Sequence, residues 1–258
     1  MNSTIEAVAA LVGDAKRVAV FTGAGISAES GIPTFRDPLT GIWARHDPEK
    51  LETASAFRED AALVWGWYLW RRAQVAQASP NAAHQAITQL ARTREVTVVT
   101  QNIDDLHERA GSADVIHLHG SLAQPKCFAC HRTPAGLFFE EPIASEGLRI
   151  EPPRCPRCKG KLRPGVVWFG ENLPALAWKR AVQVARDCDV LLSIGTSGVV
   201  FPAAEIPIIA LHSGAYVVHI NPAQVAEPSS RELCLIGSAT EHVPALVSLM
   251  MLTDMLPS

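Results

Sequence analysis

Short apolar runs rich in β-branched residues recur along the chain, and each is followed by a turn or a polar cluster. They span residues 18–22, 96–100, 115–118, 190–194 and 216–220. Segments with a helical spacing of apolar residues separate several of these runs. This alternation predicts an α/β fold, a Rossmann-like parallel sheet covered by helices.

Each predicted strand is followed by a glycine or a polar motif. These motifs begin at Gly23, Gln101, His119, Gly195 and Asn221. Because the carboxyl ends of parallel strands meet at one edge of a sheet, where ligands bind, we expect the five motifs to form a single site.

Two segments interrupt the alternation. Residues 38–80 carry a helical pattern with a dense aromatic stretch at 65–70, and residues 121–164 are rich in proline, glycine and cysteine. We therefore predict a Rossmann-like domain made of residues 1–37, 81–120 and 165–258. The helical module and the cysteine-rich module would form a smaller domain, with the active site in the cleft between it and the sheet.

Composition limits the classes of partner. The chain has 258 residues, 48% of them hydrophobic, and a net charge of −3, so it can bury a sizeable core but exerts no long-range attraction on nucleic acid or an acidic membrane. No apolar run reaches the roughly 18 residues of a membrane span, and the first residues lack the layout of a signal peptide. We expect a cytoplasmic, monomeric protein.

Four of the six cysteines form two Cys-x-x-Cys pairs, Cys127 with Cys130 and Cys155 with Cys158, separated by 24 residues. This spacing is typical of a four-thiolate zinc ribbon, whose closed tetrahedral shell leaves no position for reactive water. A redox pair or metal-free thiols are the alternative. Basic residues nearby also leave nucleic-acid binding open, although we interpret them as a solvated surface: Arg132, Arg154, Arg157, Lys159, Lys161 and Arg163.

The first predicted strand runs into Gly23-Ala24-Gly25, and Ser27 then opens a predicted helix. Glycines there would let backbone amides approach a phosphate, whose oxygens a helix amino end favours. A dinucleotide-binding dehydrogenase would next show a second strand and an acidic residue about 20 positions on. The next strand-like run begins only at residue 96, which disfavours an NAD-dependent oxidoreductase.

Six motifs together resemble the sirtuins, a family of NAD-dependent protein lysine deacylases. They are GAGISAESGIPTFRD at 23–37, QNID at 101–104, LHG at 118–120, the two cysteine pairs, VWFGE at 167–171 and GTS at 195–197. The resemblance covers nearly the whole chain. It implies NAD as co-substrate, one structural zinc ion and acylated-lysine proteins as substrates. The products would be nicotinamide, O-acyl-ADP-ribose and free lysine.

The resemblance also assigns roles to residues. His119 would be the base that takes a proton from a ribose hydroxyl, with Asn102 and Asp104 as catalytic partners near that ribose, while His117 would be structural. The residues implied to bind the cofactor are Gly23, Ala24, Gly25, Ser27, Glu29, Thr34, Phe35, Arg36, Trp43, Gln101, Asn102, Ile103, Asp104, Gly195, Thr196, Ser197, Asn221 and Ala239.

For the substrate, we interpret residues 167–171 as an exposed strand edge, with a core strand carrying an aromatic pair as the alternative. The resemblance implies that this edge pairs with an extended peptide. Tyr68 and Arg71, three apart on a helix, share a face and resemble the pair by which desuccinylase-type sirtuins hold an acyl carboxylate. Glu52 stands where the family has a small alanine, and it would repel succinate if it faced the pocket. The peptide-binding residues are Val167, Trp168, Phe169, Gly170 and Glu171.

The sequence thus predicts a deacetylase that is also a desuccinylase or demalonylase, with the balance open. Without the resemblance, the pattern around Tyr68 favours an aromatic core helix with a surface arginine pair. Protein mono-ADP-ribosylation, which uses the same cofactor, remains an alternative activity.

Overall fold

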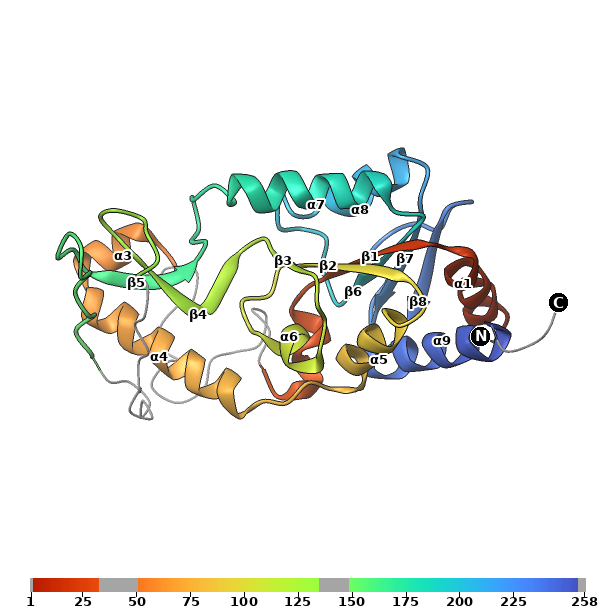
Figure 1. Ribbon diagram of the computed structural model, residues 1–258, viewed down its shortest axis with the longest axis horizontal. Coiled ribbons are helices and arrows are strands. Elements are labelled where there is room, and N and C mark those ends of the chain that lie inside the picture. Colours follow the sequence, from red (N-terminus) through yellow and green to blue (C-terminus); the bar gives the residue numbers. More distant parts are fainter. Residues whose placement is uncertain (1, 33–50, 135–148, 255–258) are drawn as a thin grey trace.

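The computed structural model describes residues 2–32, 51–134 and 149–254 (Figure 1). Its larger part is a six-stranded parallel sheet with the strand order β3-β2-β1-β6-β7-β8. The strands are β1 Arg17–Thr22, β2 Glu95–Thr100, β3 Val115–His117, β6 Val190–Ile194, β7 Tyr216–Asn221 and β8 Glu232–Ile236. The predicted fold class is confirmed, and the five predicted strands are all present.

Helices cover both faces of this sheet (Figure 1). α1 Asn2–Asp14, α5 Ala82–Leu90 and α9 Ala239–Asp254 pack on one face, and α7 Ala175–Asp187 and α8 Glu205–His212 pack on the other. The central strands are therefore buried on two sides: every residue of β1 after the first is buried, and so is all of β6. Burial on both faces explains why these strands appear as continuous apolar runs.

Two local predictions fail. β8 was missed because only Leu235 of its five residues is buried, as expected for an edge strand with a weak apolar pattern. The helix predicted from Ser27 is replaced by two 3-10 turns, η1 Ala24–Ile26 and η2 Ala28–Ser30. Gly31 adopts a left-handed conformation (φ 84°) and Pro33 follows shortly after, so the chain cannot continue as a helix.

The smaller part combines a two-stranded antiparallel sheet with two helices. β4 Gly120–Cys127 pairs with β5 Leu162–Val166, and α3 Ala54–Glu59 and α4 Ala61–Gln77 pack against them (Figure 1). Thr53 caps α3 by accepting from the Ala56 amide (3.1 Å), and Asp60 caps α4 by accepting from Leu63 (3.0 Å). Such caps satisfy amides that have no intrahelical partner. The predicted domain boundaries themselves remain a prediction.

α6 Leu106–Ala110 follows β2 in the chain (Figure 1). None of the helices in the described ranges is both long and apolar enough to cross a bilayer.

Candidate functional site

The loops at the carboxyl ends of β1, β2, β6 and β7 are joined by hydrogen bonds. The Gly25 amide donates to the Gly195 carbonyl (2.8 Å), the Gln101 side-chain amide donates to Thr196 Oγ1 (2.8 Å), and Asn221 Nδ2 donates to the Thr196 carbonyl (2.6 Å). The structure therefore brings these five predicted residues together at one edge of the sheet, as expected for ligand sites in parallel sheets.

The glycines after β1 have a different structural role from the predicted one. A Cβ on Gly23 would lie 2.8 Å from the Gly195 carbonyl oxygen, and one on Gly25 would lie 2.7 Å from Gly195 Cα. The Gly23 and Gly25 amides already donate to the carbonyls of Ile194 and Gly195. The absent side chains thus let two loops pack on each other, and these two amides are not available to a phosphate.

Ser27, Asn102 and Asp104 form one buried network below these loops. Asn102 Nδ2 donates to Ser27 Oγ (3.2 Å), and Ser27 Oγ donates to Asp104 Oδ2 (3.1 Å). The Leu106 amide donates to the other Asp104 oxygen (3.1 Å). Burial raises the pKa of Asp104, and these hydrogen bonds work against that rise. The network fixes the orientation of three side chains that were predicted to bind the cofactor.

His119 has one ring nitrogen anchored and one available. Its Nδ1 donates to the Gln101 carbonyl (2.9 Å), and its Nε2 has no hydrogen-bond partner among the described residues. Because Nδ1 carries the proton, the Nε2 lone pair can accept one. Burial lowers the pKa of His119, so the neutral form of the ring dominates at neutral pH.

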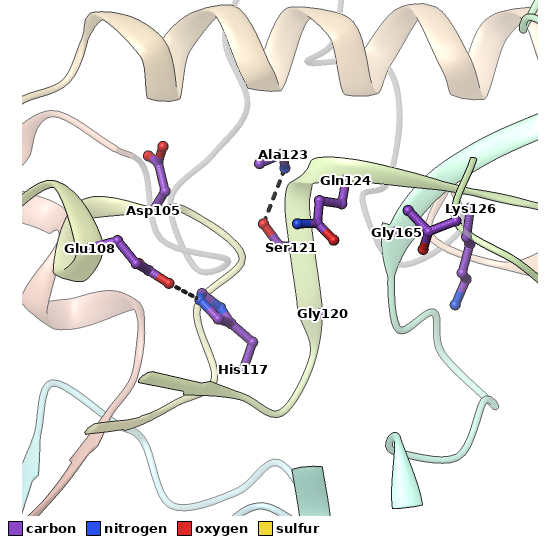
Figure 2. A pocket seen from close by; sticks show the side chains of 10 residues that line it. Asp105, Glu108, His117, Gly120, Ser121, Ala123, Gln124, Lys126 and Gly165 are labelled. Atoms are coloured by element: carbon purple, nitrogen blue, oxygen red, sulfur yellow. Dashed lines mark hydrogen bonds and ion pairs between the residues drawn. The ribbon is translucent and has the colours of Figure 1, made fainter. Parts of the chain in front are cut away.

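His117, by contrast, uses both ring nitrogens within the protein. Nδ1 donates to the Asn102 carbonyl (3.1 Å) and Nε2 to Glu108 (2.7 Å), at the wall of a hollow of about 440 Å³ (Figure 2). Burial lowers the pKa of His117, but the hydrogen bond and charge of Glu108 outweigh it and the pKa is raised. These contacts support a structural His117 and favour His119 as the base. Of the predicted site residues that the structure describes, none lines this hollow.

Two further histidines, which the sequence analysis did not single out, lie under the same loops. His107 Nε2 donates to Thr22 Oγ1 (3.1 Å), which donates to Thr100 Oγ1 (2.8 Å), and the His84 ring lies 4.9 Å from that of His107. Burial lowers the pKa of His84 to about 4 and that of His107 to about 3. Both rings are therefore neutral in the folded protein.

Acid should destabilise the fold through these rings. Since their folded pKa values lie below the unfolded value near 6.5, the unfolded state binds more protons between about pH 6.5 and 4, and the free energy of unfolding falls as the pH is lowered through that window. Each ring should contribute a loss of about 2 kcal/mol at pH 5 relative to pH 7.5. Urea unfolding at both pH values measures the loss, which should be smaller in His107→Gln. The exposed His212 provides the control variant His212→Gln. If the wild type and both variants lost the same unfolding free energy at pH 5, the assignment of buried neutral histidines would be contradicted.

Four predicted cofactor residues, Thr34, Phe35, Arg36 and Trp43, lie outside the described residues. The others are described. Glu29 accepts a hydrogen bond from Thr240 Oγ1, next to the buried Ala239 at the start of α9. The Ile103 carbonyl accepts from the Leu122 amide (2.9 Å), which joins this loop to β4. Ala24 and Ser197 are half-buried.

The segment 167–171 is adjacent to His119 but is not a strand. β5 ends at Val166, and the Val167 amide donates to the His119 carbonyl (2.8 Å). Trp168 is buried, whereas 49% of Phe169 is exposed, and the Glu171 amide closes a turn onto the Trp168 carbonyl (2.9 Å). The predicted exposed strand edge is therefore wrong for these residues, and their binding of a peptide remains a prediction.

Contacts of the Arg163 side chain stabilise the turn formed by residues 167–171. Its guanidinium forms an ion pair with Glu171 and lies 3.2 Å from the ring centroid of Trp168, with only 1% of the residue exposed. Glu171 also accepts from the Trp168 amide (3.0 Å). The prediction of a solvated basic surface is therefore wrong for Arg163. Its partner lies on the turn after β5, and nothing in the sequence pairs the two.

Tyr68 and Arg71 are both buried on α4, with 1% and 9% exposed. Trp168 Nε1 donates to the Tyr68 hydroxyl (2.9 Å), and the Arg71 guanidinium lies 5.5 Å from the ring centroid of Trp67. The alternative that placed Arg71 on the surface is thus wrong, whereas the aromatic core of α4 is present. A phenol and a guanidinium on one buried helix face can bind a small anion.

The four cysteine sulfurs predicted to bind zinc converge. All lie within 4.8 Å of one another, with Sγ–Sγ distances of 3.4 Å between Cys127 and Cys158 and 4.0 Å between Cys130 and Cys155. All four are free thiols rather than disulfides. Tetrahedral zinc with Zn–S bonds of about 2.3 Å requires sulfurs about 3.8 Å apart. The cluster therefore fits a structural zinc ion.

A model of the Sir2 family matches residues 23–202. The chain belongs to the Sir2 family. It is 62% identical over 234 residues to an NAD-dependent protein deacylase of Pseudomonas putida, with 90% of this chain and 89% of the relative covered. It is 61% identical over 230 residues to NAD-dependent protein deacylase 4 of Pseudomonas syringae pv. tomato, with 88% and 90% covered. The resemblance stated from the sequence motifs is confirmed.

Solved members of the family have the same fold as this Sir2 chain. A Sir2 homologue in complex with NAD is 41% identical, with a TM-score of 0.84 and coverage of 96% of this chain and 94% of that structure. Sir2Af2 bound to a myristoylated histone peptide is 34% identical, with a TM-score of 0.75 and coverage of 98% and 99%.

Proposed function

We propose that this Sir2 family chain is an NAD-dependent protein lysine deacylase. The observation that carries the proposal is the state of His119, whose Nδ1 is tied to the Gln101 carbonyl while Nε2 has no hydrogen-bond partner in the part of the chain that the structure describes. A neutral imidazole held in this tautomer is suited to accept a hydroxyl proton near neutral pH. The names of the relatives and the NAD complex of the solved homologue support the same activity.

The residues at this edge fit a dinucleotide. NAD supplies a ribose carbon that is activated by the departure of nicotinamide. Asn102 and Asp104, oriented through Ser27, would bind the ribose and carboxamide near His119, and Gln101 would bind the same ribose. Asn221 would bind the adenine ribose. The amides and carboxylate of these side chains match the donors and acceptors of hydroxyl groups. With NAD bound, His119 would accept a ribose hydroxyl proton at Nε2.

The acylated lysine would enter beside the segment 167–171. This segment is joined to His119 through the Val167 amide, and the buried Trp168 connects it to Tyr68. The exposed Phe169 and Gly170 would contact the peptide, and the acyl group would lie toward Tyr68 and Arg71. Acylated-lysine proteins are accordingly the proposed substrates, in line with the myristoylated peptide bound to Sir2Af2.

The activity is tested with acetyl-lysine and succinyl-lysine peptides incubated with and without NAD and analysed by mass spectrometry. We expect unmodified lysine, nicotinamide and O-acyl-ADP-ribose only when NAD is present. Deacylation without NAD, or peptide that gains an ADP-ribose mass instead of losing its acyl group, would contradict the proposal.

We further propose that Tyr68 and Arg71 let the enzyme act on succinyl- or malonyl-lysine besides acetyl-lysine. Arg71→Met should lower kcat/KM for a succinyl-lysine peptide at least about tenfold more than for the acetyl-lysine peptide, because only the former loses a charge-assisted hydrogen bond. Steady-state kinetics on matched peptides measures the ratio. Arg72→Met, the next residue of the same helix, is the control and should leave the ratio unchanged. Equal losses with both peptides in Arg71→Met would remove this role from Arg71.

A further inference from the structure

Glu52 lies against the predicted acyl site, although it precedes α3 rather than belonging to α4. Its backbone carbonyl accepts from the Phe169 amide (2.9 Å), one residue after Trp168, which bonds the Tyr68 hydroxyl. Only 5% of Glu52 is exposed. Two adjacent residues of the proposed peptide-binding segment therefore bond the Glu52 backbone and the Tyr68 hydroxyl.

Glu52, Tyr68 and Arg71 influence one another electrostatically. Burial raises the pKa of Glu52 to about 7, and the positive charge of Arg71 works against that rise. Burial also raises the pKa of Tyr68, and the negative charge of Glu52 adds to the rise, whereas Arg71 and Arg163 oppose it. The charge of the buried Glu52 carboxyl group is therefore felt by the Tyr68 phenol, as that of the Arg71 guanidinium is by Glu52.

One oxygen of this carboxyl group lacks a hydrogen-bond partner. Glu52 Oε1 is fully buried and accepts no hydrogen bond from any described residue. A buried acceptor left unpaired is costly. An acyl chain that carries a hydroxyl group would supply the missing donor, whereas a terminal carboxylate would bring a second negative charge to the same place.

We propose that Glu52 determines the acyl selectivity of this enzyme: it favours acyl chains with a hydroxyl group on the third carbon and disfavours dicarboxylic acyl groups. The third-carbon hydroxyl reaches about as far from the lysine amide as the carboxyl carbon of a succinyl group, which is the depth predicted for Tyr68 and Arg71. This inference rests on the proposed deacylase function. It concerns the relative rates of substrates and not the existence of the activity.

The hydroxyl preference is measured with two peptides that differ by one oxygen, 3-hydroxybutyryl-lysine and butyryl-lysine. The assay is run at about pH 8.5, where a carboxyl group with a pKa of about 7 is ionised. For the zinc-loaded wild-type enzyme with NAD, kcat/KM should then be about tenfold or more higher for the hydroxylated peptide, the effect of one hydrogen bond to a charged acceptor. Glu52→Ala should remove that preference. Equal values for the two peptides in the wild type, or a preference that persists in Glu52→Ala, would overturn the proposal.

The charge effect is measured with succinyl-lysine and acetyl-lysine peptides. Glu52→Gln preserves the shape of the side chain, removes its charge and should raise the succinyl-to-acetyl ratio of kcat/KM about tenfold or more, because a like charge is removed. Glu59→Gln, an exposed residue of the adjacent α3, is the matched control and should not change the ratio. An unchanged ratio in Glu52→Gln would overturn this part.

Failure of the inference and failure of the deacylase function give different results. If the function fails, the wild type releases no nicotinamide with any of the four peptides. If only the inference fails, all proteins are active and the ratios do not depend on Glu52. A Glu52 variant that misfolds is recognised by its melting temperature. In that case the wild-type rates with the 3-hydroxybutyryl and butyryl peptides still test the hydroxyl preference.

Discussion

Replacing His119 with alanine is expected to lower the rate of NAD-dependent deacylation by roughly 10²–10⁴-fold, the range for loss of a general base. The fold should survive, because the imidazole makes one hydrogen bond within the described ranges, to the Gln101 carbonyl. The measurement is kcat with saturating NAD and an acetyl-lysine peptide, together with the melting temperature. The low pKa of His119 also keeps the ring neutral, and the wild type active, at a more acidic pH than an exposed imidazole would allow.

His117 provides the discriminating variant. Both of its nitrogens are used by Asn102 and Glu108, so His117→Ala should lower the melting temperature and reduce kcat much less than His119→Ala. His212→Ala, on the exposed side of α8, should change neither. A larger loss of kcat in His117→Ala than in His119→Ala would show that the base has been assigned to the wrong histidine.

Removing the zinc ion should unfold the module that contains β4 and β5. The apolar cluster around the thiols is small, since it joins two of them only to Leu162, Trp65 and Leu69 among the buried residues that the structure describes. Zinc binding contributes on the order of 10 kcal/mol to such a fold. Deacylation should be lost with the metal, since β5 leads directly into the segment joined to His119. Chelation followed by metal analysis, circular dichroism and an activity assay tests this expectation.

Cys155→Ser should reproduce the effect of chelation, with a zinc content near zero. Cys234→Ser, on β8 and outside the cluster, should retain one zinc per chain and full activity. Metal-free protein that keeps its melting transition and its deacylation rate would contradict a structural zinc site.

The central strands and the edge where the site lies could be predicted from the sequence because burial on both faces gives long apolar runs. The edge strand β8 could not, since its pattern is only partly apolar. The helix predicted at Ser27 failed because the left-handed Gly31 permits only short 3-10 turns. The helix propensities of a few residues do not predict a left-handed glycine.

The contacts that decide the chemistry depend on residues far apart in the chain. Ser27 bonds Asn102 and Asp104 across more than 70 positions, and no pattern in the sequence indicates these bonds. Glu52 could be aligned with a family position, but its burial depends on packing that the sequence does not show. The burial of Arg163 could not be predicted either, because a strand pattern does not show which face of the strand a charged residue occupies.

The central claim is that this chain consumes NAD in step with lysine deacylation. The most direct test measures nicotinamide and deacylated peptide in the same reaction at several times. One nicotinamide should be released per lysine freed, with almost none when the acylated peptide is omitted. Lysine freed without an equal amount of nicotinamide, or nicotinamide released at the same rate without the acylated peptide, would contradict the claim.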